Sequence, residues 1–141
     1  MNINQIRFQV LLIFGGCVLS QTTQAQVFEI KNASKRYDVK MTTSCTDRSC
    51  DGQANIDLYL KGTAQRFQRF SSAELTMDLD ETDKPSVNVV QLYGEQSALI
   101  FADFNFDGSE DVAIRNGNYG AYGGPTYDVY ASFIEPRINL F

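Results

Sequence analysis

An acidic segment in the second half of the chain carries the side chains best suited to binding chemistry. Residues 103–111 read Asp-Phe-Asn-Phe-Asp-Gly-Ser-Glu-Asp, so oxygen-bearing side chains recur at alternate positions around a glycine. Calcium prefers about six to eight oxygen ligands, and a short loop supplies them in this way when a glycine permits a sharp turn. The pattern therefore predicts a Ca²⁺ site with five ligands: Asp103, Asn105, Asp107, the backbone carbonyl of Ser109, and Asp111.

This segment differs from an EF-hand. Its twelfth position is Ile114 rather than a bidentate glutamate, and its flanks at 99–101 and 112–114 are typical of strands. A solvated acidic turn without a metal is the alternative interpretation. If calcium binds, a weak site with a structural role suffices for an exported protein, because extracellular modules work at roughly millimolar calcium.

A Gly/Tyr segment follows at 116–127, with the sequence Asn-Gly-Asn-Tyr-Gly-Ala-Tyr-Gly-Gly-Pro-Thr-Tyr. Glycines allow close backbone approach, and tyrosines give large amphipathic contacts, so the segment predicts a recognition loop. The alternative is a wide turn whose tyrosines pack on a sheet. The candidate contact residues are Asn116, Gly117, Tyr119 and Tyr122, with Tyr119 expected to matter most. The acidic segment ends five residues before Asn116, so a bound ion is expected to hold the base of this loop.

The N-terminal residues 1–25 resemble a secretory signal. Arg7 precedes an apolar run at 8–19, which is well short of the ~20 residues that span a bilayer, and Thr23-Gln24-Ala25 offers a cleavage site. Export to the periplasm is therefore expected. A lipoprotein signal with a lipid on Cys17 is one alternative, and a buried N-terminal strand or helix is another.

Two cysteines, Cys45 and Cys50, remain after the predicted signal. An even pair in an exported chain favours a disulfide, so Cys45 and Cys50 are expected to pair and close a short polar loop. A redox or metal site is the alternative. The spacing does not fit CxxC chemistry, and no second cysteine pair accompanies it.

Composition excludes several classes of function. The chain has no histidine, which removes Ser-His and Cys-His catalysis and His-ligated zinc. Its net charge of -5 argues against nucleic acid and anionic membranes as partners. Acidic pairs such as Asp78 and Asp80 have the residue types that glycoside hydrolysis needs, but nothing in the sequence sets their separation. We therefore expect a protein that is not an enzyme.

The hydrophobic pattern along the rest of the chain has a period of two. Short runs rich in β-formers are separated by turn signals such as Lys61-Gly62, Asp83-Lys84-Pro85 and Asp107-Gly108. A length of 141 residues allows one domain, expected at 26–141, and the pattern predicts a small antiparallel all-β fold. Expected strands include 56–60, 75–79, 87–92, 98–101, 112–114 and 127–130.

The continuous stretch at 101–130 resembles the signature of an exported bacterial family, and the upstream segment at 50–62 is also similar, so the resemblance covers most of residues 45–130. That family includes inhibitors of invertebrate-type lysozymes and calcium-binding immunity proteins paired with peptidoglycan-degrading effectors of type IV secretion. The resemblance implies a small antiparallel β structure, propeller-like in the immunity members, that plugs a muramidase cleft with a loop. The family's Ser-Gly-x-x-Tyr motif has its nearest match in Asn116-Gly117-Asn118-Tyr119, with Asn in place of Ser and a shorter spacing.

The resemblance predicts an inhibitor of a lysozyme-like muramidase or peptidoglycan-degrading effector. Family members continue past the Tyr-Asp-Val-Tyr strand with several more strands, whereas Ile138-Asn139-Leu140-Phe141 leaves room for one short strand. A reduced or C-terminally shortened domain is therefore expected. The alternative function is that of a calcium-stabilised β module with a structural or binding role unrelated to lysozyme.

Overall fold

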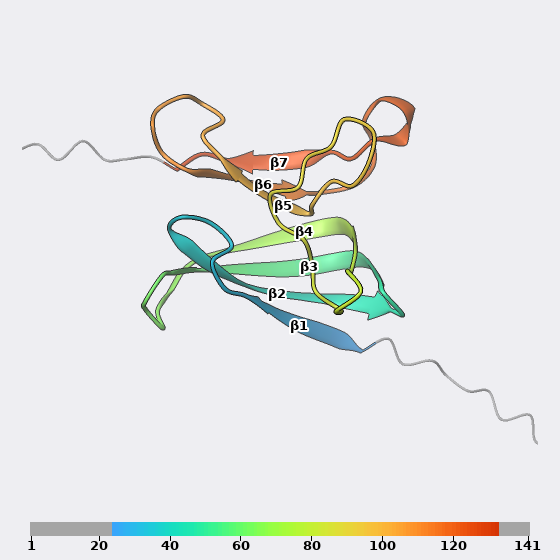
Figure 1. The fold of residues 1–141 in the computed structure, drawn as a ribbon, viewed down its shortest axis with the longest axis horizontal. Coiled ribbons are helices and arrows are strands. Elements are labelled where there is room, and N and C mark those ends of the chain that lie inside the picture. The colour runs from blue at the N-terminus through green and yellow to red at the C-terminus, as the bar shows by residue number, and fades with distance from the viewer. Residues whose placement is uncertain (1–23, 133–141) are drawn as a thin grey trace, which may run out of the picture.

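The computed structural model describes residues 24–132, which form two antiparallel β-sheets (Figure 1). Residues 1–23 of the predicted signal, with Cys17, lie outside these residues, as does the segment 138–141. The first sheet has the order β1-β2-β3-β4 and the second β5-β6-β7. The strands are β1 (Ala25–Ile30), β2 (Tyr37–Thr46), β3 (Ser49–Leu60), β4 (Arg66–Asp78), β5 (Leu99–Ala102), β6 (Asp111–Arg115) and β7 (Tyr127–Tyr130).

The prediction of a small antiparallel all-β fold is confirmed. The described residues build sheets of four and three strands rather than a closed barrel. Every neighbouring pair of strands is antiparallel, and each hairpin joins strands that are consecutive in the chain. Among residues 24–132, no helix is long and apolar enough to cross a membrane.

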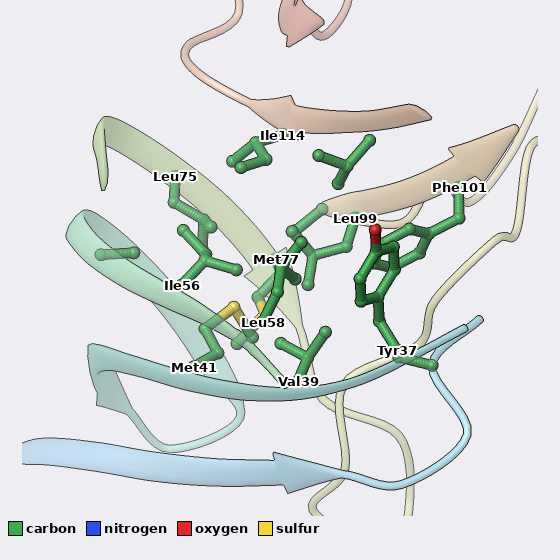
Figure 2. Close-up of a cluster of buried hydrophobic side chains, with 14 of the residues drawn as sticks. Tyr37, Val39, Met41, Ile56, Leu58, Leu75, Met77, Leu99, Phe101 and Ile114 are labelled. Carbon is green, nitrogen blue, oxygen red and sulfur yellow. The ribbon is translucent and has the colours of Figure 1, made fainter. Parts of the chain in front are cut away.

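The hydrophobic core lies between the two sheets (Figure 2). Alternation along β2 turns Tyr37, Val39 and Met41 inward while their neighbours stay half-buried, as a period-two strand requires. Sheet β5-β6-β7 supplies Leu99 and Ile114, each about 1% exposed, from the opposite side. The two sheets are therefore joined by apolar packing, and β4 lies directly against β6.

The predicted disulfide is confirmed. Cys45 and Cys50 are direct cross-strand partners in the β2–β3 register, and their sulfurs are bonded. Both cysteines lie inside strands, and the turn between them is made by residues such as Asp47, which has a φ of 54°. The dipeptide Asp51-Gly52, whose residue types are typical of a turn, does not form one. Gly52 instead lies in β3, where the register shifts against β4.

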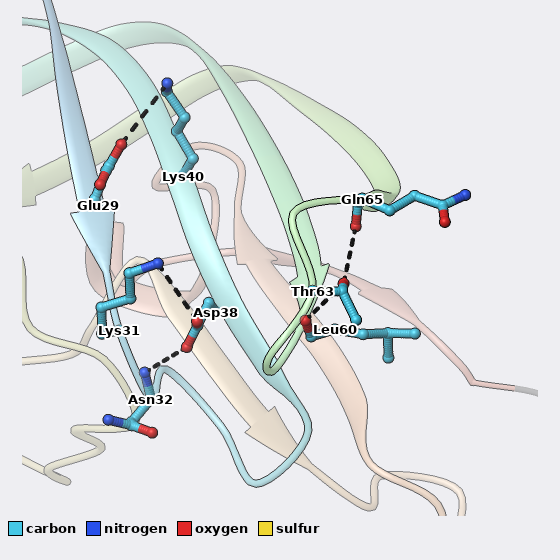
Figure 3. A network of polar contacts seen from close by, with 8 residues as sticks. All are labelled: Glu29, Lys31, Asn32, Asp38, Lys40, Leu60, Thr63 and Gln65. Carbon is cyan, nitrogen blue, oxygen red and sulfur yellow. Dashed lines mark hydrogen bonds and ion pairs between the residues drawn. The ribbon is translucent and has the colours of Figure 1, made fainter.

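The outward faces of the first sheet carry charged pairs. Glu29 of β1 lies 3.9 Å from Lys40 of β2, and the loop residue Lys31 lies 3.5 Å from Asp38 (Figure 3). Such exposed pairs contribute little each. A stronger pair lies between β3 and β4, where both carboxylate oxygens of the buried Asp57 accept hydrogen bonds from Arg69, at 2.6 and 2.7 Å.

The expected strand at 87–92 is wrong. Residues 79–98 instead form a long excursion between β4 and β5 that holds three isolated bridges. Asn88 breaks the extended run with a φ of 61°, its N–H bonds to the carbonyl of Leu99 at 3.0 Å, and its side chain bonds to two further segments. Its amide donates to the carbonyl of Ala33 at 2.8 Å, and its oxygen accepts from the N–H of Phe101 at 2.7 Å.

Candidate functional site

The two predicted site segments are hairpin loops at opposite ends of β6. The acidic loop, residues 103–110, joins β5 to β6, and the Gly/Tyr loop, residues 116–126, joins β6 to β7 (Figure 1). A strand rises about 3.3 Å per residue, so the five residues of β6 hold the two loops too far apart for direct contact. The expectation that an ion in the acidic loop holds the base of the Gly/Tyr loop is therefore wrong.

The acidic loop is organised by its own side-chain oxygens. The Asp103 carboxylate accepts from the N–H groups of Asp107 and Gly108, at 3.0 and 2.9 Å. Asn105 accepts from the N–H of Asp107 at 3.1 Å, and Asp107 accepts from the N–H of Ser109 at 2.7 Å. This bond to Ser109 is the main reason that the pKa of Asp107 lies below its usual range. Three of the five predicted ligands thus point into the turn of their own loop.

Asp111 is placed differently from the other predicted ligands. It is 1% exposed, and its two oxygens accept from the N–H groups of Phe104 and Ser132, at 2.9 and 2.7 Å. It therefore ties the start of the acidic loop to the residues that follow β7. Such a buried carboxylate has a structural task whether or not a metal binds.

The donor chemistry of the acidic loop fits calcium, which binds carboxylate, amide and carbonyl oxygens. Ser109 is 4% exposed, and its hydroxyl has no partner among the described residues. It lines a cavity of about 480 Å³ together with Asp103 and Gly108. Within residues 24–132, however, no three Asp, Glu or Cys side chains stand close enough together to hold a metal. Calcium binding therefore stays a prediction.

Asn116 fixes the base of the Gly/Tyr loop. Its side-chain oxygen accepts from the N–H groups of Ala73 and Glu74 in β4, both at 3.2 Å. Its side-chain nitrogen donates to Asp128 in β7 at 2.8 Å. The N–H of Gly117 adds a bond to the carbonyl of Glu74 at 2.8 Å. Asn116 and the buried Gly117, both predicted contact residues, thus attach the loop to two strands of different sheets.

The ring of Tyr119 lies against Gly117 at the base of the Gly/Tyr loop. Its hydroxyl donates to the Glu74 carboxylate, and this bond is the first cause of a pKa above the ordinary value for tyrosine. Gly117 has a φ of 93°, and a Cβ at that position would collide with the Tyr119 ring. The loop therefore needs glycine at 117 for both its backbone conformation and the close approach of the ring.

Tyr122 is the projecting group of the loop. It lies in the short 3₁₀ turn Ala121–Gly123 with a φ of 58°, and its side chain is fully exposed. On either side of this turn, the N–H of Gly120 donates to the carbonyl of Gly124 at 2.9 Å, and this bond holds the two sides of the loop together. The arrangement presents Tyr122, which is more exposed than the 73% exposed Tyr119 of the same loop, on a narrow, hydrogen-bonded support.

A second exposed apolar tip lies at the same end of the molecule, and the sequence did not identify it. Leu92 and Tyr93 are 84% and 95% exposed. The segment that follows them, 94–98, lines a cavity together with Arg115, and the hydroxyl of Tyr127 donates to the carbonyl of Ser97 at 2.8 Å. The wrong assignment of 87–92 to a strand hid this tip. The glycine of Tyr93-Gly94, directly after Leu92, was the available turn signal.

Asp80, one of the two carboxylates considered for glycoside hydrolysis, accepts hydrogen bonds within its own turn. One oxygen of Asp80 accepts from the N–H and hydroxyl of Thr82, at 2.7 and 2.8 Å, and from the N–H of Lys84 at 3.0 Å. These bonds, with that from the Thr82 hydroxyl first, lower the pKa of Asp80. Asp80 therefore caps the turn after β4.

Comparison of the chain with protein-family models, with curated proteins and with solved structures gives no match.

Proposed function

We propose that this chain is an exported inhibitor of a lysozyme-like peptidoglycan glycosidase, acting in immunity or defence, and that its Gly/Tyr loop enters the enzyme cleft. The observation that carries the proposal is the fully exposed Tyr122 on a loop whose base is tied to β4 and β7. Binding costs less when the contact group is already held in place, because little conformational freedom is then lost. Aromatic side chains on such supports are typical of binding hot spots.

The chemistry of a lysozyme cleft suits this loop. Glycosidases of this kind carry a pair of catalytic carboxyl groups flanked by subsites for sugar rings. A tyrosine hydroxyl donates to a carboxylate while its ring stacks where a sugar would lie. Because the Tyr119 hydroxyl already donates to Glu74, Tyr122 is the group with a hydroxyl available for the enzyme. This reverses the order of importance expected from the sequence.

The contact surface includes the second tip. Leu92 and Tyr93 lie at the same end as the loop and present apolar surface that would contact the rim of the cleft. Charge favours the encounter as well. Removal of residues 1–25 subtracts Arg7 and no acid, so 11 basic against 17 acidic residues leave a net charge of -6. Such a charge steers the protein toward a basic enzyme.

Localisation and calcium complete the proposal. The Cys45–Cys50 disulfide is compatible with export, and we place the protein in the periplasm, with a lipid anchor on Cys17 as the alternative to free secretion. Calcium in the acidic loop would stabilise the β5–β6 hairpin and, through Asp111, the residues after β7. The metal would have no direct part in the contact with the enzyme, because the acidic loop lies at the other end of β6.

The test is a lytic assay with peptidoglycan and lysozymes of several types, including the invertebrate type, in the presence and absence of the chain. Inhibition of at least one type, lost in a loop variant that remains folded, supports the proposal. A folded protein that inhibits none of them, in calcium and in chelator, favours the alternative of a calcium-stabilised β module with another role. A pull-down with the enzyme that is inhibited distinguishes direct binding from an effect on the substrate.

A further inference from the structure

An apolar groove of about 580 Å³ lies between the two sheets, at the end of β6 that adjoins the acidic loop. Strands β2, β3 and β4 form one wall, and β6, β7 and the two residues after β7 form most of the other. The volume falls within the range of about 300–1,000 Å³ that is usual for small-molecule sites. The Gly/Tyr loop contributes none of the described lining residues, so the groove is separate from the proposed contact with an enzyme.

Aromatic side chains line both walls of this groove. Tyr37 of β2 and Phe67 of β4 stack with ring centroids 5.5 Å apart, and Phe70 of β4 packs on Tyr130 of β7 at 4.4 Å. Phe67 is 54% exposed and Tyr130 is 36% exposed, so part of this ring surface faces solvent. Exposed rings grouped in a groove are typical of a binding site, because they offer flat apolar faces to a ligand.

One carboxylate lies among these apolar walls. Glu110 is the only charged residue among the described residues that line the groove, and none of them is basic. Its Oε1 atom accepts from the backbone N–H of Lys35 at 3.4 Å, whereas its Oε2 atom is buried and has no hydrogen-bond partner in the described part of the chain. A buried carboxylate oxygen without a donor is costly. The groove therefore offers a ligand an acceptor for a hydrogen bond and a negative charge.

A protonated amine is complementary to both features of the groove. Its N–H groups donate to a carboxylate in a charge-assisted hydrogen bond, and its positive charge is attracted to the faces of aromatic rings. The guanidinium of Arg36, which does not line the groove, makes a contact of this kind with the Tyr37 ring, 5.5 Å from its centroid. An aromatic ring attached to the amine would in addition stack on the exposed rings and remove their faces from water.

We propose that this groove binds a small arylalkylamine, a protonated amine that carries an aromatic ring. The ammonium group donates to Oε2 of Glu110, and the ring lies on Phe67 and Tyr130. A lysine side chain of a protein partner would supply the ammonium group but no ring, and would leave the exposed ring faces uncovered. The proposal does not depend on the proposed inhibitor function, since the groove and the Gly/Tyr loop lie at different ends of β6.

The first experiment compares three ligands of similar shape on the unaltered full chain. Phenethylamine, 2-phenylethanol and 3-phenylpropanoate share a benzene ring and a two-carbon spacer and differ in the charge of the end group. Calorimetric titration in chelator, which prevents calcium from competing for the carboxylate, is expected to give binding of phenethylamine about tenfold tighter than that of the alcohol. The propanoate is expected to bind most weakly. Equal binding of the three ligands, or no binding of phenethylamine, would overturn the proposal.

Butylamine separates the two sources of an amine. It has the charge and the reach of a lysine side chain but no ring, so it is expected to bind more weakly than phenethylamine. Equal binding would assign the groove to a lysine side chain of a protein partner and would overturn the choice of a small arylalkylamine.

The second experiment uses matched carboxylate variants. Glu110→Gln keeps the shape of the side chain and removes its charge, so it is expected to lower the affinity for phenethylamine by about tenfold and to leave that for 2-phenylethanol unchanged. Glu81→Gln makes the same change of net charge at an exposed residue outside the lining, and is expected to change neither affinity. Equal losses of phenethylamine affinity in the two variants would assign the effect to net charge and would contradict the proposal.

The third experiment tests the aromatic wall. Phe67→Ala is expected to weaken the binding of phenethylamine and 2-phenylethanol alike, because both ligands lose the same ring contact. Phe106→Ala, which removes a 91% exposed ring of the acidic loop outside the lining, is expected to weaken neither. If Phe67→Ala does not fold, the ring-proton resonances of Phe67 and Tyr130 in the unaltered chain decide. Resonances that do not shift during the phenethylamine titration would place the ligand elsewhere and overturn the proposal.

Discussion

The hydroxyl of Tyr119 donates a hydrogen bond to the carboxylate of Glu74, which joins the Gly/Tyr loop to the edge strand β4. The two residues are 45 positions apart in the sequence, and the N–H of Gly117 bonds to the backbone carbonyl of the same glutamate. Glu74 therefore holds the loop through both its side chain and its main chain. The orientation of the loop depends on β4 as much as on the β6–β7 hairpin to which the loop belongs.

The bond between Tyr119 and Glu74 predicts a specific titration. A neighbouring carboxylate raises the pKa of Tyr119, so the hydroxyl should lose its proton above the usual value of about 10. Its stabilising effect is then fully present below about pH 10 and is lost as the pH rises through the higher folded-state pKa. Glu74→Gln should lower the pKa of Tyr119, which carbon-13 labelling of the tyrosine rings measures. An unchanged pKa would show that the bond is not formed in solution.

The close contact between Gly117 and Tyr119 predicts unequal costs for two similar substitutions. Gly123→Ala places a Cβ in open space at a φ of 74°, so it should cost about 1–2 kcal/mol of folding free energy for the left-handed backbone alone. Gly117→Ala has the same kind of strain at a φ of 93° and also displaces the Tyr119 ring. It should therefore cost more in urea unfolding. Equal costs would mean that the ring moves freely.

The pair between Asp57 and Arg69 predicts a pH-dependent contribution to stability. The hydrogen bonds from Arg69 lower the pKa of Asp57 in the folded state, so the pair stabilises the fold above the unfolded value of about 3.9. That contribution is lost as the pH falls through the lower folded-state pKa. Asp57→Asn should cost about 1–2 kcal/mol at neutral pH, and this cost should shrink as the pH is lowered through the folded-state pKa of Asp57, by urea unfolding at each pH. A cost that is independent of pH would assign the effect to packing.

The acidic loop predicts a calcium response that two substitutions of one residue separate. Wild type should have a higher thermal midpoint in calcium than in chelator. Calcium at 100 times its Kd adds about 2.7 kcal/mol to the free energy of unfolding. Asp107→Asn keeps an oxygen that accepts from the N–H of Ser109 but removes a charge, so it should keep most of the metal-free stability and lose calcium affinity. Asp107→Ala should lose both. If wild type ignores calcium and calorimetry detects no binding, the loop is an acidic turn.

Much of the fold is predictable because its strands obey simple alternation. In β2 the apolar residues that alternate in the sequence, Tyr37, Val39 and Met41, are those that face the core. The disulfide is predictable from the parity of the cysteines and their separation from the signal. The strand expected at 87–92 does not form because Asn88 takes a left-handed conformation. Its side chain bonds to Ala33 and Phe101, and local sequence does not show these distant contacts.

The candidate site was predictable as two segments but not as an arrangement. Local sequence shows that 103–111 is acidic and that 116–127 is rich in glycine and tyrosine. It does not show that a five-residue strand places them at opposite ends. Nor does it show that Glu74 occupies the hydroxyl of Tyr119, because that contact crosses from one sheet to the other. The ranking of Tyr119 over Tyr122 rested on the match of residues 116–119 to the Ser-Gly-x-x-Tyr motif, whereas exposure depends on the packing of distant strands.

The last prediction concerns Tyr122. If this side chain enters an enzyme cleft, Tyr122→Ala should weaken inhibition by at least about 2 kcal/mol, the scale of an aromatic hot spot and roughly a 30-fold change in the inhibition constant. The thermal midpoint should stay unchanged, since the ring makes no buried contact. Tyr93→Ala, which removes an equally exposed ring from the neighbouring tip, should weaken inhibition less, because it would lie at the rim of the cleft. Tyr127→Ala should instead act on stability, through the lost bond to Ser97. A folded Tyr122→Ala protein that inhibits as well as wild type would remove this tyrosine from the mechanism.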